Sequence, residues 1–149
     1  MLKKFKPNLN PTHTPKIHPA LGLLSLLGFL GLLGFVPTMT YSGEISTIPT
    51  LFFFFGFFGW AGLYYQGKMS GTFIDERFKF NKTRASSLAY KSGFVLLFST
   101  CVLVKTAING GLLAIDQTAI AILIAAAGFS LALFLFLDPY LLYKYENEE

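Results

Sequence analysis

Two neighbouring apolar stretches decide the fold: residues 21–36 read LGLLSLLGFLGLLGFV, and residues 51–65 read LFFFFGFFGWAGLYY. Two more apolar stretches follow, at residues 88–107 and 118–137. A helix that crosses the hydrocarbon core of a bilayer needs about 20 mostly apolar residues, and about 17 are sufficient. Each stretch meets this length or reaches it through flanking residues. The sequence therefore predicts an integral membrane protein with four spans, at about residues 20–36, 49–66, 87–107 and 118–138.

The composition supports the same class of protein. Charged residues make up 13% of the chain, whereas a typical soluble domain has about 25%. The polar segments are too short for a separate domain, since a chain below about 40 residues rarely builds a stable core alone. We expect an all-α four-helix bundle of two helical hairpins, with the third helix extended into the cytoplasm. Its parts are a basic, proline-rich arm at 1–19, one membrane domain at 20–139 with a loop at 67–86, and an acidic tail at 140–149.

Lysine and arginine gather in alternate connections between the predicted spans. Short loops rich in these residues stay on the cytoplasmic side of a membrane. The connections at residues 38–50 and 108–117 hold Glu44 and Asp116 as their only charges. The arm and the 67–86 loop carry Lys3, Lys4, Lys6, Lys16, Lys68, Arg77, Lys79, Lys82 and Arg84. We therefore expect both termini in the cytoplasm, and we attribute the net charge of +4 to topology rather than to direct nucleic-acid binding.

Glycine recurs at every third residue of the first two predicted spans. The repeat consists of Gly22, Gly28, Gly31 and Gly34, with Ser25 in phase, and of Gly56, Gly59 and Gly62. In lipid, small residues let helix backbones approach each other closely. Because an α-helix has 3.6 residues per turn, this spacing predicts a band that winds around the helix rather than a straight stripe. We expect a tightly packed hairpin of spans one and two; a glycine-lined path or a homodimer face is the alternative.

The loop at residues 67–86 is the candidate binding site. Thr72 followed by Asp75 resembles a capping box, which would start the third helix before it enters the membrane. Aromatic and basic residues interleave after it, as in helices that lie near lipid headgroups. A docking surface for a cytoplasmic partner is the functional alternative, and its candidate residues are Asp75, Glu76, Arg77, Lys79, Asn81, Lys82 and Arg84.

Three motifs occur in a fixed order along the chain. They read LGLLSLLGFLGLLGF at residues 21–35, FFFFGFFGWAGLYYQGKMS at 52–70 and IDERFKFNKTRASSLAY at 74–90. Together they resemble a family of small, uncharacterised bacterial membrane proteins grouped as a domain of unknown function. The resemblance covers about residues 20–100 and implies a place in the bacterial cell membrane. Because some similar proteins are encoded beside DNA-binding regulators or peptide exporters, it also implies regulation or immunity at the membrane, without enzyme activity.

The spans lack the groups that intramembrane catalysis requires. A nucleophile with a base, or a set of metal ligands, would have to lie at membrane depth, but no His, Asp or Glu is near the centre of any span. Cys101 is expected to be a small packing residue. Lys105 could pair with Asp116, which could equally cap the fourth span. We therefore predict no enzyme activity, no metal site and no cofactor.

Two non-enzymatic functions are consistent with these features. In the first, the basic loop binds a cytoplasmic transcription regulator and tethers or inhibits it at the membrane. In the second, the chain is a bacteriocin immunity protein or an accessory subunit of a membrane transporter, and the glycine-rich hairpin makes contacts inside the lipid bilayer. A homo-oligomer is compatible with either function.

Overall fold

The computed structural model describes residues 13–36, 38–39, 45–46, 49–113 and 117–147. Within these ranges the protein is helical except for a two-residue antiparallel pair and short connections. The pair is formed by β1 (Thr38–Met39) and β2 (Ile45–Ser46) between the first two helices. The helices are η1 (Pro19–Phe35), η2 (Pro49–Ala61), which continues directly into α1 (Gly62–Lys68), α2 (Glu76–Asn109) and α3 (Gln117–Asn147).

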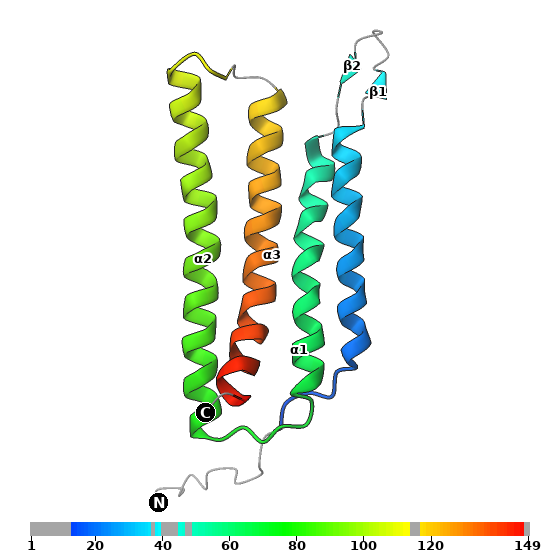
Figure 1. The fold of residues 1–149 in the computed structure, drawn as a ribbon, viewed down its shortest axis with the longest axis vertical. Coiled ribbons are helices and arrows are strands. Elements are labelled where there is room, and N and C mark those ends of the chain that lie inside the picture. Colours follow the sequence, from blue (N-terminus) through cyan, green and yellow to red (C-terminus); the bar gives the residue numbers. More distant parts are fainter. Residues whose placement is uncertain (1–12, 37, 40–44, 47–48, 114–116, 148–149) are drawn as a thin grey trace, which may run out of the picture.

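The helices lie side by side in a single row, in the order α2, α3, η2 with α1, and η1 (Figure 1). The two helices of each predicted hairpin pack against each other: η1 against η2, and α2 against α3. Among the described residues, however, the backbone of α2 is not adjacent to that of η2, nor is the backbone of η1 adjacent to that of α3. In this open row η2 packs between η1 and α3, and α3 packs between η2 and α2. The two expected hairpins are present, and the row does not confirm the expected four-helix bundle.

Both helices of the first hairpin are 3-10 helices, of 17 and 13 residues. Such helices rarely exceed three or four residues. A 3-10 helix has three residues per turn, so residues three apart lie directly above one another. The glycine repeat consequently forms a straight stripe on η1, and the prediction of a winding band is wrong because it assumed α-helical geometry.

The glycine stripe of η1 faces a row of aromatic side chains on η2 and α1. A Cβ atom added at Gly31 would lie 2.5 Å from the Phe55 ring, and one added at Gly28 would lie 2.6 Å from Phe58. The pairing runs antiparallel, so that Gly28, Gly31 and Gly34 each face one phenylalanine ring, whereas Gly22 faces the Cβ and backbone of Tyr64. We call this arrangement the glycine–phenylalanine zipper; it pairs Gly22 with Tyr64, Gly28 with Phe58, Gly31 with Phe55 and Gly34 with Phe52.

The zipper explains why a long 3-10 helix is stable here. An α-helix would rotate successive glycines away from η2, whereas three residues per turn keep every glycine in contact along the whole hairpin. The rings also stack on one another, with Phe55 at 6.0 Å from Phe52 and 6.1 Å from Phe58 between ring centroids. Tertiary packing thus outweighs the better hydrogen-bond geometry of the α-helix.

Helix type determines how far each helix reaches. At about 2.0 Å per residue, η1 is about 34 Å long, and η2 with α1 is about 36 Å long. At about 1.5 Å per residue, α2 is about 51 Å long and α3 about 46 Å. The α2–α3 hairpin is therefore longer than the roughly 30 Å hydrocarbon core of a bilayer, and η1 matches that core with only 17 residues.

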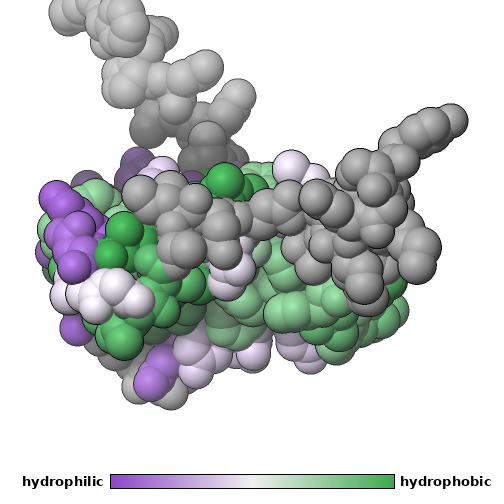
Figure 2. Space-filling view, turned by 90° about the horizontal axis from the view of Figure 1, so that it is seen from above, coloured by the Kyte–Doolittle hydropathy of each residue, from purple (hydrophilic) through white to green (hydrophobic). Residues whose placement is uncertain are grey.

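Within the described ranges, two helices, α2 and the part of α3 from Thr118 to Asn147, are long and apolar enough to cross a membrane. A core helix of a soluble protein can pass the same test of length and composition, but it would be mostly buried. In their most apolar windows, only 17% of α2 and 11% of α3 are buried. Many large apolar side chains are exposed, and Figure 2, which views the row from above, shows hydrophobic surface at much of its rim.

Two helix ends differ from the predictions. The carboxylate of Asp75 accepts a hydrogen bond of 2.7 Å from the Phe78 amide, so Asp75 itself caps α2 and the predicted capping box at Thr72 is wrong. The last helix was expected to end at residue 138, but α3 continues through Pro139 to Asn147. Pro139 has no N–H for the Leu135 carbonyl four residues earlier. Gly62 of α1 packs closely against this part of α3, and a Cβ added there would meet the Leu135 carbonyl oxygen and the Pro139 ring.

Candidate functional site at the polar end of the helix row

The polar groups gather at one end of the row, which we call the polar end; it consists of residues 13–18, 66–86 and 138–147. Its centre is a small apolar core in which Met69, Phe78, Ala85 and Leu142 are buried. These four residues come from the α1–α2 connection, from α2 and from the last turns of α3. The extension of α3 beyond Pro139 therefore supplies part of this core.

Residues 13–18 form a strap that binds across the α1–α2 connection. The Thr14 amide donates to the Thr72 carbonyl at 2.9 Å, and the Thr14 hydroxyl accepts from the Thr72 amide at 2.9 Å. The Ile17 amide donates to the Ser70 hydroxyl at 2.9 Å. Gly71, with φ of +78°, makes the turn that this pairing requires, since that conformation strains other residues. Residues 13–18 of the expected extended arm are therefore fixed to the protein; residues 1–12 lie outside the described ranges.

Among the seven candidate docking residues, Asp75, Asn81 and Arg84 make contacts that hold the ends of α2 and α3. Asp75 caps α2, as described above. Asn81 is buried, and its amide donates to the Glu146 carboxylate at 2.7 Å. The Arg84 guanidinium lies 4.6 Å from the centre of the Tyr145 ring, within the range of a cation–π interaction. Asn81 and Arg84 thus connect α2 to the end of α3.

The other four candidates, Glu76, Arg77, Lys79 and Lys82, are exposed on the first turns of α2. Two aromatic side chains are exposed near them, Phe73 at 52% and Phe80 at 68%. The structure therefore brings basic and aromatic groups together on the outer surface of this segment. We call the surface formed by Phe73, Glu76, Arg77, Lys79, Phe80 and Lys82 the basic–aromatic face.

The seven glycines expected in helix packing are all buried. Those of η1 form the zipper, whereas Gly56, Gly59 and Gly62 face α3. An added Cβ at Gly59 would lie 2.7 Å from the Ala132 carbonyl oxygen, so the η2 and α3 backbones approach each other very closely. Both glycine sets are therefore occupied by contacts within the chain.

Sequence reasoning did not predict a third row of small residues, on α2. Ala85, Ala89 and Gly93 are spaced four apart and are buried against α3. The Ser130 hydroxyl donates to the Gly93 carbonyl at 2.7 Å. The signal was present, since small residues four apart are typical of helix contacts in membranes.

Two residues of α2 that were expected to pack or to form an ion pair are exposed. Cys101 is exposed rather than packed. Lys105 is also exposed. Its suggested partner Asp116, and Glu44 of the first connection, lie outside the described residues, so the roles predicted for them stay predictions.

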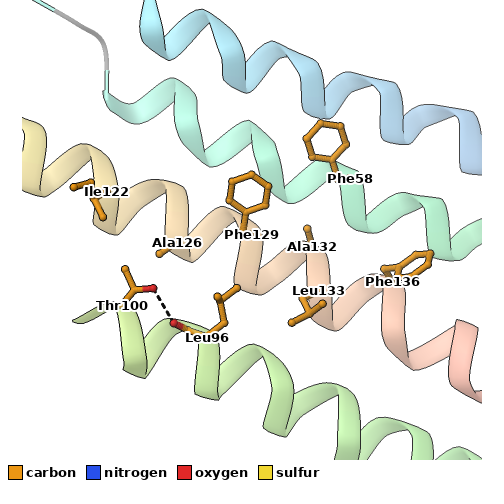
Figure 3. Close-up of a pocket in the computed structure, with 9 residues that line it drawn as sticks. All are labelled: Phe58, Leu96, Thr100, Ile122, Ala126, Phe129, Ala132, Leu133 and Phe136. Atoms are coloured by element: carbon orange, nitrogen blue, oxygen red, sulfur yellow. Dashed lines mark hydrogen bonds between the residues drawn. The ribbon is translucent and has the colours of Figure 1, made fainter. Parts of the chain in front are cut away.

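An apolar groove of about 580 Å³ follows the face of α3 between α2 and η2 (Figure 3). Phe58 reaches it from η2, and Leu96 and Thr100 reach it from α2. The Thr100 hydroxyl donates to the Leu96 carbonyl at 2.9 Å, so this polar group is satisfied within its own helix. The groove is the space that the open row leaves between α2 and η2, and it offers no chemistry beyond an apolar surface.

Comparisons with protein-family models, curated proteins and solved structures give no match for this chain. The resemblance to a family of small bacterial membrane proteins therefore stays a prediction.

Proposed function

We propose that the chain is a multi-pass membrane protein in which all four helical segments cross the bilayer. The support comes from η1, where the buried residues are Gly22, Gly28, Gly31 and Gly34. Its leucine and phenylalanine side chains point outward, among them Leu23 at 67% exposure and Phe29 at 56%. Soluble proteins bury such residues, whereas lipid solvates them and leaves the helix contact to small residues.

The lengths of the helices are consistent with this placement. The 17 residues of η1 are short for an α-helical span, but as a 3-10 helix they match the roughly 30 Å core. If the Asn109 end of α2 lies at the outer surface of the hydrocarbon core, about 20 Å of α2 at its Glu76 end extends beyond that core on the other side. That protruding part carries the basic–aromatic face. The positive charge at the polar end supports a cytoplasmic location for this end and for both termini.

Within this placement, the function supported best is a non-enzymatic docking protein that tethers or inhibits a cytoplasmic regulator. The basic–aromatic face carries this proposal, because it is exposed and extends beyond the lipid. Three of its charges are positive, and its two aromatic side chains supply apolar contact area. Arginine and aromatic residues are enriched at interfaces, and the face has Arg77, Phe73 and Phe80, while its lysines provide positive charge that attracts an acidic partner.

The alternative, an immunity or transporter-accessory protein, receives less support. It required the glycine-rich hairpin to contact another protein inside the membrane. The glycines of that hairpin instead contact rings of the hairpin itself or the backbone of α3. A transporter subunit would have to bind the exposed leucine surface of η1 or the apolar groove.

Neutralising the basic–aromatic face tests the docking function. A photo-crosslinking residue at Phe80 should capture a soluble cytoplasmic protein in cells. The combined change Arg77→Gln, Lys79→Gln and Lys82→Gln should reduce this capture about tenfold, because three charge contacts are lost. Capture would be measured by mass spectrometry of the crosslinked products.

The matched control is Lys16→Gln with Lys68→Gln, which removes exposed positive charge outside the face and should leave capture unchanged. A carboxy-terminal tag, tested for access from the cytoplasm, verifies that the orientation is kept. Unchanged capture by the triple variant, or capture of lipid and other copies of the chain alone, would contradict the docking function. Capture of a transporter subunit would favour the alternative.

A further inference from the structure

A second site lies at the polar end, beneath the strap. It is a cavity of about 190 Å³ whose walls come from the strap, the α1–α2 connection, α2 and α3. Most of its lining is apolar, including Ile17, Met69, Phe78 and Leu142. Typical sites for drug-sized ligands have about 300–1,000 Å³. The cavity therefore suits a group of a few heavy atoms rather than a whole lipid or peptide.

Two polar side chains in this lining have unused hydrogen-bonding capacity. Within the described part of the chain, the half-buried Asp138 carboxylate accepts one hydrogen bond, from Ser86, and its second oxygen has no partner. The carboxamide of Gln66 likewise has no hydrogen-bond partner among the described residues. The half-buried carboxylate therefore keeps an acceptor oxygen open toward the cavity, which favours a ligand with a cationic donor, because charge-assisted hydrogen bonds are the stronger ones.

A third polar side chain in the lining favours a ligand that also carries a negative charge. Lys82 lines the same cavity and is exposed, but it forms no ion pair with Asp138 in the described structure. A negative charge and a positive charge therefore line one small cavity without neutralising each other. A zwitterion with its ammonium group toward Asp138 and its anionic group toward Lys82 satisfies both.

The position of the cavity identifies the source of this ligand. Tyr65 and Tyr140 pack together near it, with ring centroids 5.2 Å apart, and Tyr140 directly follows the lining residue Pro139. Tyrosine collects at the level of lipid headgroups. We propose that the cavity binds the phosphoethanolamine headgroup of a membrane lipid. The ammonium donates to Asp138 and Gln66, and the phosphate pairs with Lys82. This inference rests on the membrane placement proposed above, but not on the docking partner.

The test uses the purified full-length chain in detergent, offered an equal mixture of phosphatidylethanolamine, phosphatidylcholine and phosphatidylglycerol. Native mass spectrometry counts the lipids that the protein retains. We expect preferential retention of phosphatidylethanolamine, because the trimethylated ammonium of phosphatidylcholine cannot donate hydrogen bonds. Asp138→Asn should reduce this retention about tenfold, the effect of losing one charge-assisted hydrogen bond, and should leave phosphatidylglycerol unchanged.

Two pairs of variants separate binding from folding. Asp138→Asn removes the negative charge but keeps an oxygen that can accept from the Ser86 hydroxyl, whereas Ser86→Ala removes this internal hydrogen bond and keeps the carboxylate. Ser86→Ala should therefore retain the lipid. Lys82→Met should weaken retention, whereas Lys79→Met, an exposed lysine outside the cavity, should not. If the Asp138→Asn variant does not fold, the comparison of Lys82→Met with Lys79→Met still tests whether the cavity binds the lipid.

Soluble glycerophosphoethanolamine distinguishes the two sources of the headgroup. Its displacement of the lipid would support recognition of the headgroup. Binding of the soluble compound without retention of the lipid would overturn the lipid proposal. Equal retention of the three lipids, or no effect of Asp138→Asn and Lys82→Met, would overturn the site itself. A chain that does not remain with the membrane fraction before purification would instead remove the proposed membrane function.

Discussion

Gly31→Leu should destabilise the protein by about 3 kcal/mol, the upper range for inserting bulk into a packed interior. Even the first added carbon, Cβ, would lie 2.5 Å from the Phe55 ring. That ring cannot move aside, because it is stacked on Phe129 of α3 at 4.5 Å between centroids. The unfolding free energy would be measured by titrating the purified protein from mild detergent into SDS.

A compensating change makes this prediction specific to the zipper. Phe55→Ala alone removes a buried ring and should also be destabilising. In the double variant the new leucine can occupy the space left by the ring, so the double variant should be more stable than Gly31→Leu alone. Leu32→Ala, on the exposed side of η1, should change stability by less than about 0.5 kcal/mol. Additive effects of the two zipper changes would contradict direct pairing.

The second large effect is expected where η2 meets α3. Gly59→Ala should destabilise the protein by about 2 kcal/mol, because the new Cβ would lie 2.7 Å from the Ala132 carbonyl oxygen. A backbone carbonyl cannot rotate away as a side chain can. Thermal unfolding, followed by size-exclusion chromatography in detergent, would measure the loss of folded protein.

Gly56 offers a matched control one helical turn away on the same face of η2. An alanine Cβ there would meet the end of the Leu131 side chain at 3.2 Å, which can shift. Gly56→Ala should therefore unfold at nearly the wild-type temperature. If both variants behave alike, the close approach of η2 and α3 at Gly59 is not as the structure describes it.

The apolar runs and their flanks were sufficient to locate the helices. The first predicted span, 20–36, corresponds to η1 at Pro19–Phe35, and the second, 49–66, to η2 and α1 at Pro49–Lys68. Helix type was not predictable from one helix alone. The 3-10 geometry depends on the rings of η2, so it appears only when both partners of the zipper are present.

The candidate site was predicted in part. The charged residues at the start of α2 are exposed as a docking surface requires, but Asn81 is buried and bonded to Glu146. The sequence did not indicate this burial, because the fourth span was expected to end at residue 138. A proline inside a helix usually ends or bends it, and Gly62, which packs against α3 at Leu135 and Pro139, lies far away in sequence.

The central claim is that a glycine–phenylalanine zipper of 3-10 helices makes a 17-residue segment long enough to cross the lipid core. Spin labels at Ala20 and Phe35, both exposed, would measure its length by pulsed electron paramagnetic resonance in nanodiscs. Cys101→Ala removes the native thiol. Labels at Phe80 and Val95 on α2 have the same separation in sequence and serve as the α-helical reference.

We expect about 30 Å for the η1 pair and about 22 Å for the α2 pair, from rises of about 2.0 and 1.5 Å per residue. Equal distances for the two pairs would mean that η1 is an α-helix. In that case the straight glycine stripe, the zipper and the span built on it would all be contradicted.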